Sequence, residues 1–373
     1  LGEEQEMLKT AARDFLTTEC PTTLVKEMAE DERGYPTELW RKMANLGWMG
    51  LTFPEEYGGS MGSFLDLGVL LSEMGYVCLP GPFFSTVVLG STIILEAGDD
   101  DQKQRLLPAI AKGDVLVAVA LTEPDAEYTA SGITVKAVPE GDGYVISGTK
   151  LFVSDAHIAD YIICVARSKE GSIGEDGISL FLVDAKSPGL TCDLLKTIAG
   201  DKQCEVVFHK VKVPRENVLG ELDRGWVYVE NLLQKAAVAR CAEMSGIAEK
   251  VLEMTVSYIK DRVQFGHQVG SFQAVQHHCA NMATDVETSR LMTYQTAWRI
   301  SEGLSYTREV AMTKAWVSDA CRRVTALGHQ VIGGVAFMED HDMPLYFKRA
   351  KAAEVAFGDA DFQREMLAEQ MEL

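Results

Sequence analysis

The sequence predicts a multi-domain α+β protein in which a helical segment, a β-rich segment and a second helical segment follow one another. Apolar residues recur at helical spacing over residues 1–113, the period shifts towards two after about residue 115, and long helical patterns return at Trp226. At roughly 100–200 residues per domain, 373 residues suggest two or three domains. We expect an N-terminal helical domain at 1–113, a β-barrel or sandwich domain at 114–222, and a C-terminal helical bundle at 223–373.

The first segment consists of short helices separated by loops. Apolar residues recur every three to four positions, and clusters of proline and glycine interrupt the pattern. Pro36 marks one helix start, because proline suits the first helical turn. The expected helices lie at residues 8–16, 36–46, 64–75 and 101–111, with loops at 54–59 and 80–82.

The second segment is rich in β-branched residues, and Gly, Asp and Pro separate its apolar runs. Because the runs are close in sequence, we expect an antiparallel β-domain. The expected strands lie at residues 115–121, 133–139, 143–147, 161–167, 178–185 and 205–213.

The third segment carries long helical patterns with apolar residues on more than one face, which is typical of a bundle. We expect a four-helix bundle with helices near residues 232–262, 273–301, 306–328 and 344–370.

The charge balance narrows the class of protein. The chain has 55 acidic and 35 basic residues, for a net charge of −20. Such a surface repels a phosphate backbone, so we expect no nucleic-acid partner. No apolar run reaches the ~18 residues that a membrane-spanning helix needs, and no secretory signal is visible. The apolar share of 47% and the charged share of 24% exclude wholesale disorder.

The eight cysteines favour a reducing compartment, since none belongs to a CxxC pair and several lie in apolar runs. We expect free thiols, with a disulfide framework or a metal site as alternatives. We therefore expect a cytoplasmic protein, with the mitochondrial matrix as the alternative compartment. Because the chain starts with Leu1 rather than Met, we also expect that a short leader has been lost.

Signatures of several other enzyme classes are absent from the sequence. No GxGxxG follows a strand, no P-loop occurs, and no GxSxG nucleophile elbow occurs. His277 and His278 are adjacent, so on a helix they do not face one metal site. We expect no metal ion.

Three segments stand out, although each alone is only a strand end, a β-turn or a helix end. They are Val119–Pro124, Gly148–Ser154, and Arg262–Gly266 followed by Gly270–Gln273. In this order, on a helix–β–helix plan, they resemble the acyl-CoA dehydrogenase family. The resemblance extends along the whole chain and includes residues 53–59, 211–214, 217–220, 330–334 and the Phe-Gly-Asp-Ala-Asp segment at 357–361.

The resemblance implies FAD held between the β-domain and the bundle. Leu121 and Thr122 match a strand end that contacts the flavin ring, and Ser154 matches a hydroxyl near flavin N5. Phe152 matches an aromatic beside the ring, and the alternative for Phe152 is a plain core aromatic. An aromatic wall and fixed donors suit a flavin, because they exclude water and tune the ring.

Other matching residues imply an oligomer. Arg262, Gln264 and Phe265 match a segment that reaches the FAD of a neighbouring subunit, where a guanidinium can pair with the pyrophosphate. The resemblance therefore implies a homodimer or homotetramer. Further FAD contacts are implied for Gln273, Gln330, Gly333 and Gly334.

The family reaction is α,β-dehydrogenation of an acyl-CoA thioester, with electrons passing to an electron-transferring flavoprotein. A carboxylate takes the α proton while a hydride leaves the β carbon. The usual glutamate position aligns with Phe357, and a second family position aligns with Ala236, so neither holds a carboxylate. Glu243 lies two helical turns past Ala236 and is flanked by apolar residues, so it is our first candidate for the base. Asp359 is the less favoured candidate, together with Asp361.

Three functions remain open at this point. The chain is a dehydrogenase with a relocated base, a family member with other thioester chemistry such as β-elimination, or the non-catalytic FAD-binding subunit of a heteromeric dehydrogenase.

The substrate region suggests an unusual acyl group. Phe83, Phe84 and Val87 lie in the segment that matches the acyl-lining helix, which has no basic residue to hold a diacid. Tyr128 replaces a small hydroxyl residue, and Asp125-Ala126-Glu127 replaces Gly-Ala-Gly just before it. We expect a cyclic or branched acyl group.

Overall fold

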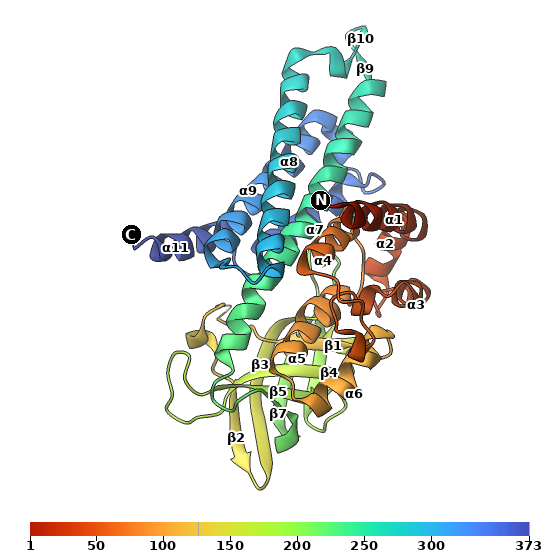
Figure 1. Cartoon of the computed structure of the whole chain (residues 1–373). Helices are drawn as coiled ribbons and strands as arrows, with labels where there is room; N and C mark the ends of the chain where they lie inside the picture. The colour runs from red at the N-terminus through yellow and green to blue at the C-terminus, as the bar shows by residue number, and fades with distance from the viewer. Residues whose placement is uncertain (126, 373) are drawn as a thin grey trace. The chain divides into compact units, whose positions relative to one another are not determined.

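The computed structural model describes residues 1–125 and 127–372, which divide into two compact units. Unit 1 contains residues 1–27, 63–79 and those from Gln234 onward; unit 2 contains residues 28–62 and 80–233 (Figure 1). The predicted domain boundaries near residues 113 and 222 were drawn from the periodicity of the sequence, whereas these two units are defined by contacts in the structure. The division into three domains therefore stays a prediction.

Unit 2 is built on an eight-stranded sheet in the order β6-β7-β3-β2-β4-β5-β8, with β1 paired to β4. Its core is apolar: Ile146, Phe181 and Val206 are fully buried in one cluster. The strands are β1 Val117–Ala120, β2 Lys136–Glu140, β3 Gly143–Ser154, β4 Tyr161–Arg167, β5 Ile178–Asp184, β6 Leu190–Leu195, β7 Gln203–Pro214 and β8 Val218–Leu219.

The sheet differs from the sequence expectation in three respects. It is mixed rather than purely antiparallel, because β1 runs parallel to β4 and the β2–β3 hairpin lies between them in the chain. Strand β3 continues to Ser154 through residues that were read as a turn. Strand β6 was missed because its residues are exposed or half-buried and give a weak apolar pattern.

The helices α3, α5 and α6 of unit 2 precede its sheet in the sequence. Trp40 of α3 donates from Nε1 to the carbonyl of Gly113, which holds α3 against the end of α6 (2.9 Å). The segment η3, Phe83–Gly90, is a π-helix of eight residues that are all buried. The other elements are α3 Thr37–Asn45, η1 Trp48–Gly50, η2 Glu55–Tyr57, α5 Ser91–Ala97, α6 Asp100–Ala111, η4 Ala130–Gly132, η5 Ala156–Ile158 and η6 Arg215–Asn217.

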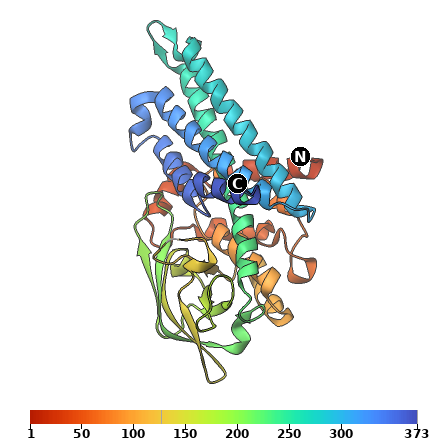
Figure 2. The same cartoon turned by 90° about the vertical axis from the view of Figure 1, so that its left-hand side faces the viewer.

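Unit 1 is helical, and α8 and α9 pack side by side in it (Figure 2). The predicted helix at 344–370 is two helices, because Phe357 and Gly358 adopt left-handed backbone angles (φ +58° and +86°) that interrupt it. The helices are α1 Glu3–Glu19, α4 Phe64–Tyr76, α8 Gln273–Ser301, α9 Thr307–Ile332, α10 Met343–Val355 and α11 Ala360–Gln370, while α2 Thr22–Glu30 and α7 Trp226–Asp261 continue into unit 2.

Helices α4 and α7 approach so closely that only glycine fits at the crossing. A Cβ on Gly75 would lie 2.0 Å from the Glu243 carbonyl oxygen, and one on Gly246 would lie 1.8 Å from that of Ser72. The backbone of Glu243 is therefore held rigidly against α4.

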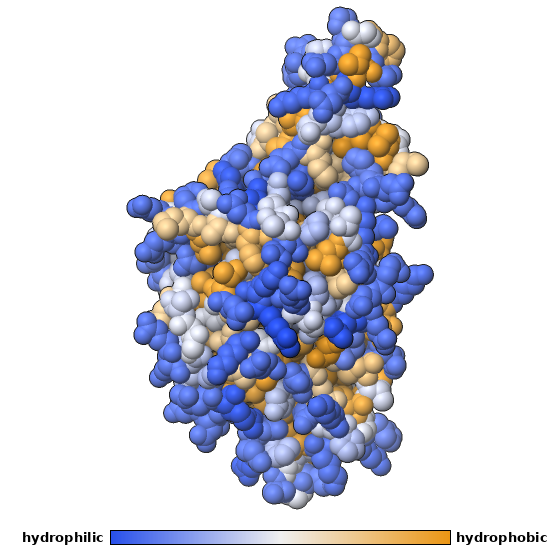
Figure 3. Space-filling view, turned by 90° about the vertical axis from the view of Figure 1, so that its right-hand side faces the viewer, coloured by the Kyte–Doolittle hydropathy of each residue, from blue (hydrophilic) through white to orange (hydrophobic). Residues whose placement is uncertain are grey.

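Helix α7 is connected to α8 by a short β-hairpin (Figure 1). Its two strands, β9 Val263–Gln264 and β10 His267–Gln268, have two residues each. Apolar side chains lie on the surface close to this hairpin, at the top of Figure 3. None of the helices that the structure describes is long and apolar enough to span a bilayer. All eight cysteines are free thiols.

Candidate functional site

Two neighbouring strand ends of unit 2 carry the predicted flavin-ring contacts. β1 leads into Leu121 and Thr122, and β3 ends at Ser154. The Leu151 N–H donates to the Thr122 carbonyl (2.8 Å), and the Lys150 ammonium donates to the Leu121 carbonyl (2.9 Å). Both carbonyls therefore face the protein, and the Thr122 side chain remains for an outside partner.

A buried ion pair fixes this strand end. Lys150 is fully buried and its Nζ lies 2.7 Å from Oε1 of Glu123, whose side chain is 4% exposed. Glu123 also accepts from the amides of Thr134 and Val135 and from the Thr134 hydroxyl. Burial acts to raise the pKa of Glu123, but Lys150 and these donors outweigh it and lower the pKa. The carboxylate is thus satisfied by protein donors although it is almost completely buried.

Phe152 is presented by an irregularity in β3. The register with β7 shifts between Lys150 and Val153, which marks a bulge that changes the direction of side chains. Phe152 has a φ of +56° and is 51% exposed. A bulky residue in the left-handed region is strained, and such strain is typical of functional positions. The alternative of a plain core aromatic is wrong, since half of the ring is exposed.

The two hydroxyls beside Phe152 are available to a ligand. Among the described residues, neither the Thr122 hydroxyl nor the Ser154 hydroxyl makes a hydrogen bond to protein. Both residues are half-buried. Two unpartnered hydroxyls and an exposed ring on adjacent strand ends fit a flat heteroaromatic group such as a flavin ring, which offers acceptors and an apolar face.

In unit 1, Arg262, Gln264 and Phe265 lie at the exposed hairpin between α7 and α8. The hairpin turn is formed by Phe265 and Gly266, both with positive φ. Phe265 is 90% exposed, and within the described chain its ring meets the edge of Phe272, with 6.3 Å between the ring centres. Gln273 is the first residue of α8 and is also exposed.

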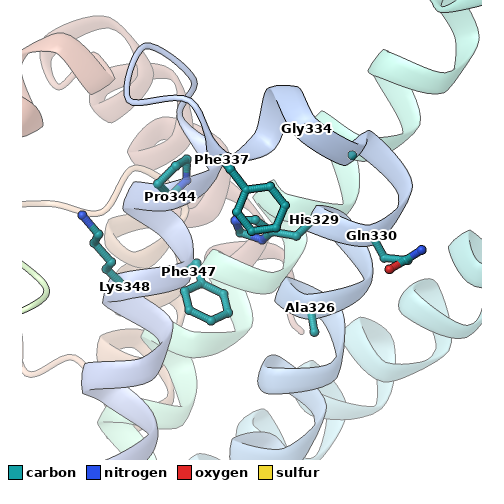
Figure 4. Close-up of a pocket in the computed structure, with 9 residues that line it drawn as sticks. Ala326, His329, Gln330, Gly334, Phe337, Pro344, Phe347 and Lys348 are labelled. Atoms are coloured by element: carbon teal, nitrogen blue, oxygen red, sulfur yellow. The ribbon is translucent and has the colours of Figure 1, made fainter.

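Gln330, Gly333 and Gly334 lie together on one pocket of unit 1, with a volume of about 580 Å³ (Figure 4). A Cβ on Gly334 would meet open space, so no contact within the chain requires glycine there. A ligand that approaches the backbone closely at this position would require glycine there. The pocket is lined by Ala326, His329, Gln330, Gly333, Gly334, Phe337, Pro344, Phe347 and Lys348.

Aromatic rings form much of this pocket. The His329 ring centre lies 5.0 Å from those of both Phe337 and Phe347. Nδ1 of His329 donates to the Thr325 carbonyl (2.9 Å), since that oxygen can only accept. With Lys348 at the rim, the lining suits a flat ring that carries negative charge nearby.

The two family positions for a base lie in or beside an apolar region of unit 1. Ala236 is fully buried. Ala237, Val238, Ala297 and Val310 form a buried cluster, and Phe357 packs against it. Neither an alanine nor a phenylalanine side chain can accept a proton, so a proton acceptor has to come from another position.

Glu243 lies on α7 with its side chain 17% exposed. It is ion-paired with Arg240 one turn earlier, so its surroundings are not the apolar ones that the sequence indicated.

The aspartates after Phe357 have structural partners. Asp359 is exposed and caps α11 by accepting from the Phe362 amide (3.0 Å). Asp361 is 86% exposed and pairs with Arg364. Both therefore have roles that do not need catalysis.

The predicted acyl contacts Phe83, Phe84 and Val87 all lie on η3 and are 2–7% exposed. Tyr128 is half-buried in the loop after β1. Of the Asp125-Ala126-Glu127 segment, Ala126 lies outside the described residues.

Sequence reasoning missed the residues that support the site. Lys150 and Glu123 lie inside the segments Gly148–Ser154 and Val119–Pro124, yet no sequence pattern indicates that they form an ion pair. Lys314 was missed as well: it is fully buried and donates to the carbonyl oxygen of Glu354, at the end of α10 (2.7 Å). Burial lowers the pKa of Lys314 to about 8. The sequence feature that could have identified Lys314 is its place among the apolar residues of a helical pattern.

Comparison with known proteins agrees with this arrangement. Residues 2–114, 118–211 and 223–372 match the models of the acyl-CoA dehydrogenase N-terminal, middle and C-terminal domains. The chain is 31% identical to the probable acyl-CoA dehydrogenase YngJ of Bacillus subtilis, covering 100% of this chain and 98% of that protein. It is 32% identical to the acryloyl-CoA reductase (NADH) of Anaerotignum propionicum, covering 100% and 95%.

A solved structure is similar over the same length. A chain of the ChsE4-ChsE5 complex from Mycobacterium tuberculosis matches with a TM-score of 0.90 and 28% identity, covering 100% of this chain and 98% of that chain. Fold and matches together define an FAD-dependent oxidoreductase that acts on the CH–CH bond of acyl-CoA thioesters. The chain belongs to the acyl-CoA dehydrogenase family.

Proposed function

We propose that this chain catalyses α,β-dehydrogenation of an acyl-CoA thioester to an enoyl-CoA, with Glu243 as the base. The observation that carries the proposal is the pair of unpartnered hydroxyls of Thr122 and Ser154, on two strand ends joined by the Leu151–Thr122 hydrogen bond, together with the exposed Phe152. The bound FAD would supply the acceptor for the hydride from the β carbon.

Each residue has a separate task in this proposal. Thr122 and Ser154 donate hydrogen bonds to the polar edge of the flavin ring, and Leu121 lies beside them. Phe152 covers the ring and excludes water. Arg262, Gln264, Phe265 and Gln273 contact FAD of a neighbouring subunit, and the pocket at Gln330, Gly333 and Gly334 takes part of the same cofactor.

The carboxylate of Glu243 removes the α proton as the hydride leaves the β carbon, so that the proton ends on Glu243. Arg240 lies beside the carboxylate as its ion-pair partner and would orient it. Asp359 is the less favoured base, because it caps a helix on the surface.

The acyl group is cyclic or branched in this proposal, with Phe83, Phe84, Val87 and Tyr128 around it. We further propose a homodimer or homotetramer that passes electrons to an electron-transferring flavoprotein. The similarity to an acryloyl-CoA reductase supports a site that can exchange hydride at the same bond in either direction.

Anoxic titration of the FAD-loaded chain with acyl-CoA thioesters tests the proposal. We expect the flavin absorbance to bleach with a cyclic or branched thioester, and Glu243→Gln to slow bleaching by about 10²–10⁴-fold. Glu230→Gln, a change at an exposed position of the same helix, is the matched control. Unchanged bleaching in Glu243→Gln would eliminate Glu243.

A second candidate function is that of an FAD-binding subunit whose partner chain supplies the base. The apolar packing around Phe357 favours it, because both family positions for the base are lost. The similarity to a chain of a two-protein complex adds support. In that case the chain alone does not bleach with any thioester, and bleaching begins when the partner chain is added.

A further inference from the structure

The π-helix η3 carries the residues that we assign to the acyl group, and it is an unusual element. It runs from Phe83 to Gly90 and every residue in it is buried. π-Helices are rare, and they occur frequently at functional sites because the wider turn shifts side chains out of the regular helical positions. Side-chain hydrogen bonds attach η3 to two places in unit 2.

The first attachment leads to the strand that carries Thr122. The amide of Val117, the first residue of β1, donates to the Thr86 hydroxyl (3.1 Å), and that hydroxyl lies 3.3 Å from the Val117 carbonyl. Thr86 is fully buried. The start of β1 and the middle of η3 are therefore held together.

The second attachment leads to the residue after Ser154. The Ser85 hydroxyl donates to Oδ2 of Asp155 (2.6 Å), and the two residues are 1% and 9% exposed. The hydroxyl also lies 3.2 Å from the Pro82 carbonyl, but the shorter bond to a carboxylate is the stronger one. Asp155 has a φ of +58°, and its amide donates to the Lys202 carbonyl (2.9 Å).

We propose that Ser85 and Asp155 form a positioning pair that couples the acyl wall on η3 to the flavin-facing end of β3, and so determines which acyl groups react. The proposal rests on the function proposed above. Ser154 precedes Asp155 directly, so a shift of Asp155 moves the Ser154 backbone. Ser85 lies between Phe84 and Val87 in η3, so the same bond sets where these side chains stand.

The physical consequence concerns the gap between the acyl wall and the flavin. An acyl group with a bulky β carbon fits only at one distance between η3 and the flavin ring. A straight acyl chain fits at several distances. A misplacement of about 1 Å can cost on the order of 10²-fold in rate. Breaking the pair loosens both sides at once, and the loss is larger for a bulky acyl group than for a straight one.

The test compares Ser85→Ala and Asp155→Ala with wild type as FAD-loaded proteins. The first measurement is the ratio of kcat/KM for cyclohexanecarbonyl-CoA to that for butyryl-CoA. The second is the visible spectrum and midpoint potential of the flavin without any thioester. We expect the ratio to change by about tenfold or more and the potential to shift in both variants.

Three variants serve as controls. Asp155→Asn keeps an oxygen that accepts from Ser85, and we expect both values to stay near wild type. Thr255→Val removes another buried hydroxyl, which donates to the Val251 carbonyl within α7, and should also change neither value. Ser85→Cys keeps the volume with a weak donor, and it replaces Ser85→Ala if that variant does not fold.

The outcomes separate this proposal from the one on which it rests. If wild type reacts with thioesters while the pair variants keep its ratio and its potential, the positioning pair is overturned. If wild type reacts with no thioester, the proposed function fails for the isolated chain, and the flavin midpoint potential still tests the positioning pair. A shifted midpoint potential in Ser85→Ala supports the pair, and an unchanged midpoint potential overturns it.

Discussion

Around Thr122 and Ser154 in unit 2, a buried ion pair holds the backbone while two hydroxyls and an exposed ring are left for a ligand. Around Phe357 in unit 1, apolar side chains pack together at the position that the resemblance aligns with the usual base. In the function proposed above, the cofactor side of the site keeps polar groups for a ligand, whereas the position of the usual base is apolar. The comparison therefore predicts that the two parts of the site have diverged separately.

The largest effect is expected when the polar region loses its buried cation. Lys150→Met leaves the Glu123 carboxylate buried without its partner, and we expect a loss of about 3–5 kcal/mol in the free energy of unfolding. Urea denaturation measures it. Lys150→Met combined with Glu123→Gln should recover most of the loss, because the amide oxygen still accepts from Thr134 and Val135. A loss below about 1 kcal/mol in the single variant would show that the pair does not hold this region.

The next effect concerns Lys314, which supports the end of α10 before Phe357. Its folded pKa of about 8 lies below the usual lysine value of 10.5, so between these pH values the unfolded chain binds more protons and stability rises with pH. Relative to Lys314→Met, wild type should gain up to about 3 kcal/mol between pH 8 and pH 10.5. Thermal or urea unfolding at several pH values measures the difference. Parallel curves would contradict the buried, cationic lysine.

A smaller effect is expected within the apolar region itself. Phe357→Ala removes a half-buried ring from the cluster, and we expect a loss of about 1–3 kcal/mol, below that of a fully buried phenylalanine. Phe357→Leu keeps most of the apolar contact and should lose less than about 1.5 kcal/mol. If Phe357→Ala unfolds like wild type, the ring is not a packed replacement for the glutamate.

The smallest effect separates ligand binding from folding. Thr122→Val should leave the free energy of unfolding of the FAD-free chain within about 0.5 kcal/mol, since its hydroxyl has no partner in the described protein. FAD should bind about 2–10-fold more weakly to this variant, the equivalent of one hydrogen bond. Thr134→Val is the contrasting control, because its hydroxyl bonds to Glu123 and its loss should reduce stability. The reverse pattern would remove Thr122 from the cofactor site.

The order of elements was readable from the sequence because it depends on local periodicity. Helix α8 and strand β4 begin and end where the apolar pattern does. The division of residues 344–370 into two helices was not readable, since Phe357 is not a residue type that normally adopts positive φ. The parallel pairing of β1 with β4 depends on contacts such as that of Val117 with Tyr161, which lie far apart in the sequence, and no local pattern encodes it.

The site was predicted only where a residue carries its own signal. Phe152 and Ser154 belong to a motif, and the structure leaves the Phe152 ring exposed and the Ser154 hydroxyl without a protein partner among the described residues, while their cofactor roles and the alignment of Phe357 with the base stay predictions. Lys150 and Ser85 act through partners far along the chain, Glu123 and Asp155, so their roles need three-dimensional contacts. The ion pair of Glu243 with Arg240 lies within one helical turn, yet the choice of partner depends on side-chain orientation.

The most direct test of this account is to restore the lost base while removing the proposed one. We would prepare Glu243→Gln, Phe357→Glu and the double variant, load each with FAD, and follow flavin bleaching by a cyclic or branched acyl-CoA without oxygen. We predict that Glu243→Gln bleaches at least 10²-fold more slowly than wild type and that the double variant regains much of the rate. A folded, FAD-bound double variant that stays as slow as Glu243→Gln would contradict the view that Phe357 stands in the position of the base.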